Sequence, residues 1–143
     1  MNLIIACATD NGEEFVNRHF GDANFYDIYS VSKEGWEYIK RVTNTTEEEE
    51  HEDEVHGDPK KAKGISQILK KHDVQVLVSR QFGLNITRVK KKFVPVVIRA
   101  KDVEEGLKLV KDHLDIIVEE YNKVEERQHI ILKNRSELDE KVC

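Results

Sequence analysis

The first candidate for chemistry in this sequence is a histidine in a polar loop. His19 precedes Phe20-Gly21, and the loop joins two apolar segments, residues 3–8 and 25–31. A neutral imidazole is a good ligand for iron and for heavier metals. The aromatic residue and the turn-forming glycine should hold the backbone, while the loop leaves the imidazole open to a ligand. On spacing alone, a histidine that only makes hydrogen bonds is the simpler alternative.

Further polar groups fall near the same strand ends. Arg18 and Arg80 can make charge-assisted hydrogen bonds to an anionic ligand, although a solvated arginine is the plainer interpretation of each. Asn11 and Gly12 follow the first apolar segment, and their backbone amides can face a ligand. Asn-Gly turns also form without any ligand. We therefore include all four residues in a candidate binding site.

A strongly acidic segment occupies residues 47–58. His51 and His56 stand there among eight carboxylates, which is a composition that can hold a hard or borderline cation loosely. Metal affinity requires ligands in fixed geometry, and mutual repulsion should keep this segment extended. A charged loop without a metal is the favoured interpretation.

Hydrophobic periodicity predicts the elements that position these residues. Strands are expected at residues 3–8, 25–31, 36–42, 74–78 and 94–98, and helices at 59–72, through Ile86, Val89 and Phe93, and from 103 onwards. Residues 32–35, Ser-Lys-Glu-Gly, predict a hairpin turn, so that the third strand becomes a half-exposed edge. The order is βββαβαβα, an α/β fold with a five-stranded mixed sheet.

The last helix is expected to be unusually long. Asp102 can cap its start, with Glu105 three residues on. Apolar side chains then alternate three and four apart in a heptad seam at Val103, Leu107, Val110, Leu114, Ile117, Tyr121 and Val124. A helix reaching Lys133 would be roughly 45 Å long, against strands of roughly 17 to 20 Å.

Two interpretations of this overhang stay open. Residues 1–120 form the domain, and residues 121–143 are either a frayed solvated tail or a helical extension that pairs with a second subunit. The second interpretation predicts a homodimer through the C-terminal helix.

Composition limits the partners. The chain has 143 residues, 36% of them charged, and a net charge of -5, so its overall field repels nucleic acid and anionic membranes. Its two cysteines cannot supply a four-thiolate site from one chain. The first apolar run has six residues and no basic flank, which is too short for a signal peptide or a membrane span. We expect a cytoplasmic protein.

Three stretches carry a family resemblance: I-I-A-C-A-T-D-N-G at residues 4–12, H-F-G-D-A-N-F-Y-D-I-Y at 19–29, and His56-Gly57. They resemble the dinitrogenase iron-molybdenum cofactor biosynthesis family over roughly residues 1 to 118. The resemblance implies a ribonuclease H-like fold and the binding or carrying of an iron-sulfur or iron-molybdenum type cluster. It implies His19 as the metal ligand and His56 as a second one, with cluster donor or acceptor proteins as partners.

One departure concerns the turn after the fourth strand. Family members commonly carry several glycines there, whereas residues 79–83 read Ser-Arg-Gln-Phe-Gly and keep only the last one. Bulky Arg80 and Gln81 should narrow the pocket. An alternative function is therefore a protein-interaction or regulatory module of the same fold that no longer binds a cluster.

No catalytic constellation is evident in the sequence. There is no nucleophile-base pair and no glycine-rich dinucleotide or phosphate loop after a strand. The first strand lacks the clustered carboxylates that two-metal hydrolysis requires. We expect a protein that is not an enzyme.

Overall fold

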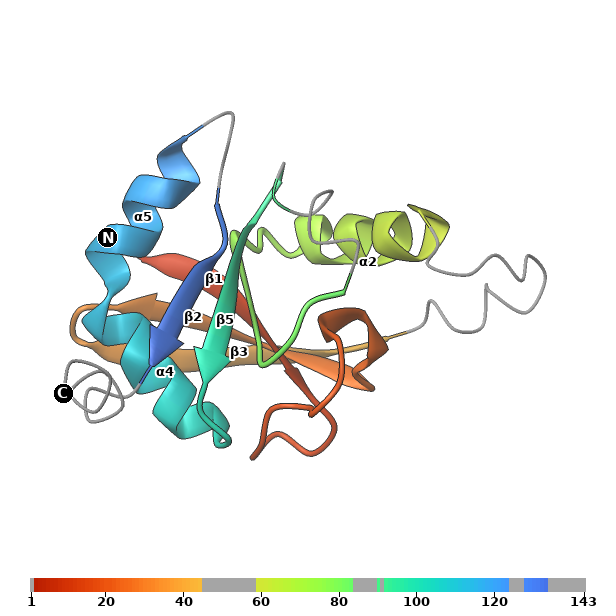
Figure 1. The fold of residues 1–143 in the computed structure, drawn as a ribbon, viewed down its shortest axis with the longest axis horizontal. Coiled ribbons are helices and arrows are strands. Elements are labelled where there is room, and N and C mark those ends of the chain that lie inside the picture. The colour runs from red at the N-terminus through yellow and green to blue at the C-terminus, as the bar shows by residue number, and fades with distance from the viewer. Residues whose placement is uncertain (1, 45–58, 84–89, 91, 124–127, 134–143) are drawn as a thin grey trace, which may run out of the picture.

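The computed structural model describes residues 2–44, 59–83, 90, 92–123 and 128–133. Within these residues six strands form one mixed sheet in the order β3-β2-β1-β4-β5-β6 (Figure 1). The strands are β1 (Leu3–Thr9), β2 (Phe25–Ser32), β3 (Gly35–Thr43), β4 (Val76–Ser79), β5 (Val94–Arg99) and β6 (Ile130–Lys133). The α/β class is confirmed, but the expectation of five strands is wrong.

The antiparallel half of the sheet follows the sequence pattern closely. β2 pairs with β1 on one side and with β3 on the other, and the turn before Gly35 closes the hairpin between β2 and β3. Only Val42 of β3 is buried, whereas most of β2 is buried or half-buried. The half-exposed edge strand is thus confirmed.

The other half of the sheet is parallel. β4 pairs with β1, β5 with β4, and β6 with β5, all in the parallel sense. All four residues of β4 are buried, as expected for an apolar strand covered on both faces. This arrangement brings the carboxyl ends of β1, β4 and β5 to one edge of the sheet, where the loop after β1 begins.

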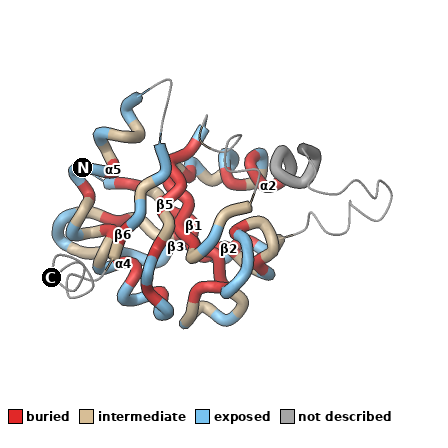
Figure 2. Tube along the Cα trace, viewed as in Figure 1, coloured by how far each residue is buried: buried red, intermediate tan, exposed pale blue. Residues whose placement is uncertain are grey.

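Helices cover both faces of the sheet (Figures 1 and 2). α2 (Pro59–Lys71) buries Ile65 and Leu69 on one face, in a core with Phe20, Tyr26 and Phe93. On the other face, α4 (Val103–Asp112) and α5 (Leu114–Asn122) pack against β1, β4 and β5. The short helix expected through Ile86 and Val89 lies outside the described residues.

The single long C-terminal helix is a wrong prediction. The helix is interrupted at His113, whose backbone leaves the helical conformation at φ -118° and ψ 24°, and α5 ends at Asn122. Residues 130–133 then form β6 beside β5. The observed order of the described elements, βββαββααβ, therefore departs from the expected one at its end. The overhang is avoided because the chain turns back to extend its own sheet.

The apolar seam of this segment is buried within the same chain. Val103, Leu107, Val110, Leu114 and Ile117 are at most 2% exposed and belong to the core between the helices and the sheet. Tyr121 packs against the same core, and Val124 lies outside the described residues. A spacing of three and four suits a helix on its own sheet as well as a coiled coil. In the described residues the seam offers no exposed stripe on which a homodimer can rest.

The start of α4 also differs from expectation. Asp102 occupies the N-cap position, but its side chain makes no capping hydrogen bond. Instead the amide of Val103 donates to the carbonyl oxygen of Glu13, at 2.9 Å. The loop after β1 therefore accepts the hydrogen bond of the first amide of α4, for which the sequence predicted the side chain of Asp102 as the acceptor.

Leu132→Ala tests whether β6 is an integral strand. Leu132 is 3% exposed and belongs to the sheet-helix core, so the substitution should lower the free energy of unfolding by about 2–4 kcal/mol. Ile131→Ala is the matched control. Because Ile131 is 44% exposed, this substitution should lower the free energy of unfolding by well under half as much. Urea unfolding measures both. Equal small losses would mean that residues 130–133 do not belong to the folded domain.

Candidate functional site

His19 stands at the carboxyl ends of β1 and β4. It precedes η1 (Phe20–Asp22), a single 3-10 turn, and its side chain is exposed. The backbones of His19 and Gln81 form an isolated parallel bridge, and the amide of Phe20 donates to the carbonyl oxygen of Gln81 at 2.9 Å. The loop after β1 is thereby fixed to the turn after β4.

Phe20 anchors the histidine loop from below. Its ring is 4% exposed and lies 5.3 Å from that of Phe82, nearly parallel to it, and 4.8 Å from that of Tyr26. The Tyr26 hydroxyl donates to the carbonyl oxygen of Phe20 at 2.9 Å. Burial of the residue after His19 keeps the imidazole at the surface while its backbone stays in place.

Gly83 gives the imidazole its room. A Cβ atom at position 83 would lie 2.9 Å from Nδ1 of His19, closer than van der Waals contact allows. Gly83 is the one glycine that the turn after β4 retains, and the structure brings it against the candidate ligand. The same strand end holds Ser79, whose buried hydroxyl has no hydrogen-bond partner among the described residues.

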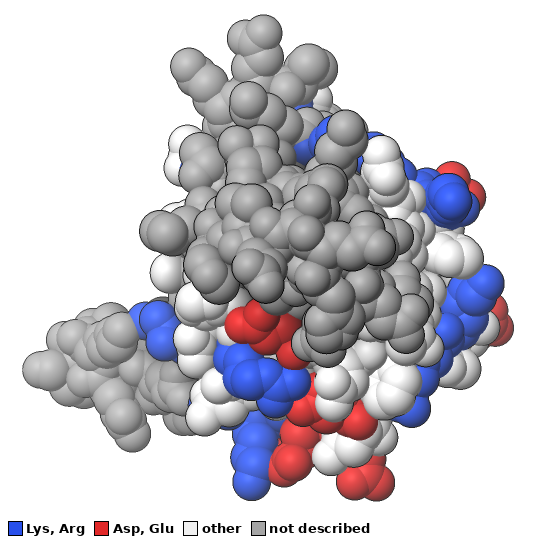
Figure 3. Space-filling model, turned by 90° about the vertical axis from the view of Figure 1, so that its right-hand side faces the viewer, with Lys and Arg blue, Asp and Glu red and all other residues white. Residues whose placement is uncertain are grey.

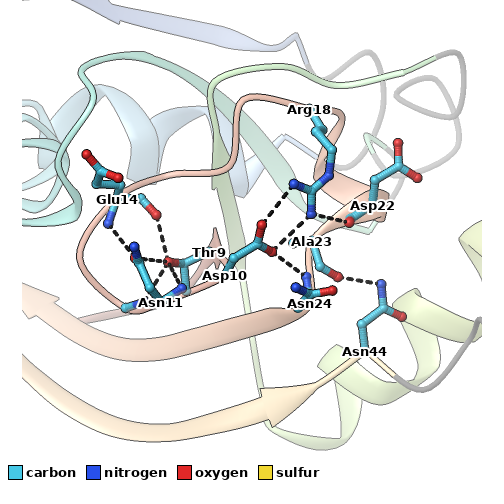
Figure 4. A network of polar contacts seen from close by, with 10 residues as sticks. Thr9, Asp10, Asn11, Glu14, Arg18, Asp22, Ala23, Asn24 and Asn44 are labelled. Carbon is cyan, nitrogen blue, oxygen red and sulfur yellow. Dashed lines mark hydrogen bonds and ion pairs between the residues drawn. The ribbon is translucent and has the colours of Figure 1, made fainter.

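Arg18 is engaged within its own loop (Figure 4). Its guanidinium donates to both carboxylate oxygens of Asp10, at 2.8 and 3.0 Å, and to the carbonyl oxygen of Asp22. Asp10 also accepts from the amide of Asn24 at 2.9 Å. The hydrogen bond from Arg18 holds the pKa of Asp10 below its usual range. In this arrangement Arg18 closes the loop rather than facing a ligand.

Asn11 and Gly12 are likewise used inside the loop. The Asn11 side-chain oxygen accepts from the amides of Glu13 and Glu14, at 2.8 and 3.0 Å. The amides of Asn11 and Gly12 donate to the hydroxyl of Thr9, at 3.3 and 2.8 Å, and Thr9 donates to the carbonyl oxygen of Glu14. These amides do not face an open site, because each already has an acceptor.

The remaining candidate residues have different surroundings. Arg80 follows β4 directly, is half-buried, and makes no ion pair with a described residue. His56, with the rest of the acidic segment, lies outside the described residues. Arg80 therefore stays available for a ligand at the edge that carries His19.

The described residues contain no group of three or more His, Cys, Asp or Glu side chains that could hold a metal ion. Cys7 is fully buried, and that burial, with a smaller contribution from the Asp27 carboxylate, raises the pKa of its thiol well above its usual range. The thiol stays protonated and forms part of the apolar core. At the carboxyl ends of β1 and β4, the described structure thus offers His19 as an exposed imidazole and no ready-made cluster of metal ligands around it.

Two polar contacts were not identified from the sequence. The side-chain amide of Asn44 donates to the carbonyl oxygens of Gly21 and Ala23, at 3.0 and 2.8 Å, which ties the end of β3 to the histidine loop. Asp27, 2% exposed, accepts from Arg41 across the β2-β3 pair at 2.8 Å. Opposite charges on paired strands were a usable signal for the second contact, whereas nothing in the sequence pointed to the first.

Charge is distributed rather than gathered on the face shown in Figure 3. Lysine and arginine side chains lie interspersed with aspartate and glutamate over its described surface. In the described residues no helix is long and apolar enough to cross a membrane.

Comparison with known proteins identifies the family. The model of the family described as "Dinitrogenase iron-molybdenum cofactor" matches residues 1–113. A comparison with curated proteins found no match.

Two solved structures of a protein from Methanocaldococcus jannaschii, described as a "putative dinitrogenase", share the fold. The crystal structure has a TM-score of 0.56 and 15% identity, covering 78% of this chain and 90% of that one. The NMR structure has a TM-score of 0.52 and 14% identity, covering 80% and 91%. At this identity the likeness concerns the fold alone.

Asp10→Asn tests the loop closure. Because the folded-state pKa of Asp10 is lowered, its ion pair stabilises the protein above the unfolded-state pKa near 4 and stops doing so as the pH falls through the folded-state value. The variant should be less stable than wild type by about 1 kcal/mol at pH 7, since both side chains are partly exposed.

That difference should shrink as the pH falls below about 4. Asp115→Asn, which breaks the more exposed pair with Lys33, is the control and should change stability little at any pH. Urea unfolding across the pH range measures both. If the difference in the free energy of unfolding between wild type and Asp10→Asn stayed the same from neutral to acid pH, the ion pair would not be its cause.

Proposed function

Because the chain belongs to the dinitrogenase iron-molybdenum cofactor family, we propose that it binds or carries an iron-sulfur or iron-molybdenum type cluster as an accessory protein in cofactor assembly. The cluster is the cargo, and the protein does not transform it. His19 supplies the metal bond through an unprotonated ring nitrogen.

The geometry around His19 carries this proposal. Its backbone is fixed on both sides, by the bridge to Gln81 and by the buried ring of Phe20, while its imidazole is exposed. Gly83 leaves the space beside Nδ1 that any other residue would fill. A histidine whose backbone is fixed and whose imidazole is exposed suits a large inorganic cluster that must bind and dissociate.

The arginines of the site have separate roles in this proposal. Arg80 adds a positive charge at the same strand end, which favours an anionic cluster. Arg18 acts indirectly, because its pair with Asp10 holds the loop that carries His19. Asn11 and Gly12 act in the same way, through the hydrogen bonds that fold the start of the loop.

A site with few protein ligands suits carrying rather than storing. One imidazole gives a single protein-metal bond, which holds a cluster in an exchangeable manner and permits transfer between a donor and an acceptor protein. His56 is proposed as a second ligand on the family resemblance.

The second candidate function is a protein-interaction or regulatory module that no longer binds a cluster. The specific observation in its favour is the edge strand β3, where Trp36, Tyr38 and Ile39 are 37%, 53% and 45% exposed. Exposed aromatic residues on an unpaired strand edge are typical of a surface that meets another protein. Bulky Arg80 and Gln81 in the turn after β4 point the same way.

His19→Ala tests the first function. After anaerobic reconstitution with iron and sulfide, the variant should bind iron about tenfold more weakly than wild type and lose the cluster absorption, with an unchanged melting temperature. Gly83→Ala should weaken binding as well, because its Cβ displaces the His19 ring without removing the ligand. Iron and sulfide analysis with an absorption spectrum measures both.

His129→Ala is the matched control, since His129 is also exposed but precedes β6 away from the candidate site. It should retain wild-type occupancy. Equal iron and sulfide contents in wild type and His19→Ala would exclude His19 as the ligand. Wild-type protein that takes up neither iron nor sulfide would favour the interaction module.

A further inference from the structure

A hollow of about 430 Å³ opens at the carboxyl ends of β4 and β5. Its walls include Arg80 and Gln81 from the turn after β4, Arg99 and Lys101 from the end of β5, and Asn17 from the histidine loop. Open α/β sheets bind ligands at this edge, beyond the carboxyl ends of parallel strands. The volume falls in the range of small-molecule sites.

The hollow concentrates positive charge in a chain whose net charge is -5. Arg80 and Arg99 make no hydrogen bond or ion pair with any described residue. Lys101 is paired with Glu14 at 3.2 Å, so its charge is partly compensated. Two uncompensated guanidinium groups thus line one hollow at the ends of adjacent strands, where neither contributes an ion pair to the described part of the fold.

A bound anion would compensate these two positive charges. Guanidinium groups match the paired oxygens of phosphate and carboxylate groups, and Asn17 and Gln81 add neutral donors at the walls. Two arginines suit a ligand with two such groups. Glu14, whose charge is balanced by Lys101, does not oppose its entry.

We propose that this hollow binds a small molecule bearing two oxyanion groups, held by Arg80 and Arg99. The site adjoins the His19 edge through Gln81, but it uses neither the imidazole nor a metal. It shares Arg80 with the proposed cluster site but depends on Arg99 rather than on His19, so His19→Ala and Arg99→Ala test the two functions separately.

Calorimetric titration of the full-length, cluster-free protein at low salt tests the proposal. Pyrophosphate and succinate are the probes, which separate a phosphate ligand from a carboxylate ligand. At least one should bind with one-to-one stoichiometry, and Arg80→Ala and Arg99→Ala should each weaken that binding about tenfold. Arg99 is exposed, so its removal should leave the fold intact.

Two control variants sharpen the result. Lys40→Ala removes an exposed cation from β3, at the far edge of the sheet, and should leave the affinity unchanged. His19→Ala should also leave it unchanged, whatever its effect on iron. Absence of binding by both probes, or an equal loss in Lys40→Ala, would overturn the proposal. A loss in His19→Ala that matches that in Arg99→Ala would overturn it too, because the anion would then belong to the histidine site.

Discussion

Burial of the Phe20 ring is the contact on which the candidate site depends. The ring fills the space between Tyr26 of β2 and Phe82 beyond β4, and its amide is bonded to Gln81. The first part of the loop is held elsewhere, by buried Phe15 and Val16, whereas Phe20 is the buried residue next to His19. With the Phe20 ring in place, His19 is presented at the surface at a fixed point of the sheet edge. The apolar core thus positions a polar ligand.

The residues of this edge fall into two groups, according to whether they already have hydrogen-bond or ion-pair partners within the fold. Arg18, Asn11 and Gly12 are bonded within the loop, so they contribute rigidity. Arg80 and Arg99 have no such partners in the described structure, so they leave uncompensated positive charge at this edge. A residue type alone does not separate these roles, because the same guanidinium can close a loop or bind an anion. The difference lies in which carboxylate the fold brings within reach.

The C-terminal segment illustrates a second limit of sequence patterns. Its seam residues Val103, Leu107, Val110, Leu114 and Ile117 are all buried, as the pattern required. The spacing of these residues does not indicate whether they are buried against a second subunit or against the sheet of their own chain. The sheet of their own chain covers them, because the turn at His113 and the return into β6 keep the segment over β5. Large exposed apolar side chains lie together on β3, at Trp36, Tyr38 and Ile39, and singly on α5 and β6, at Ile116 and Ile131.

The sequence by itself determined the local elements and the family. Period-two alternation, the Ser32 to Gly35 turn and continuous apolar runs predicted five strands close to their observed bounds. The H-F-G motif identified His19, and its family was confirmed over residues 1–113. These features are local, since each depends on residues within a few positions of one another.

Tertiary structure decided the features that depend on residues far apart in the chain. β6 is a short apolar run that the expected long helix included, and it forms a strand because β5 offers an edge for it to pair with. Gly83 lies against His19, and Arg80 and Arg99 line one hollow, because parallel pairing brings the ends of separate strands to one edge. The local spacing of residues does not indicate which distant strands pair. The folded sheet therefore decides which charged side chains find a partner and which do not.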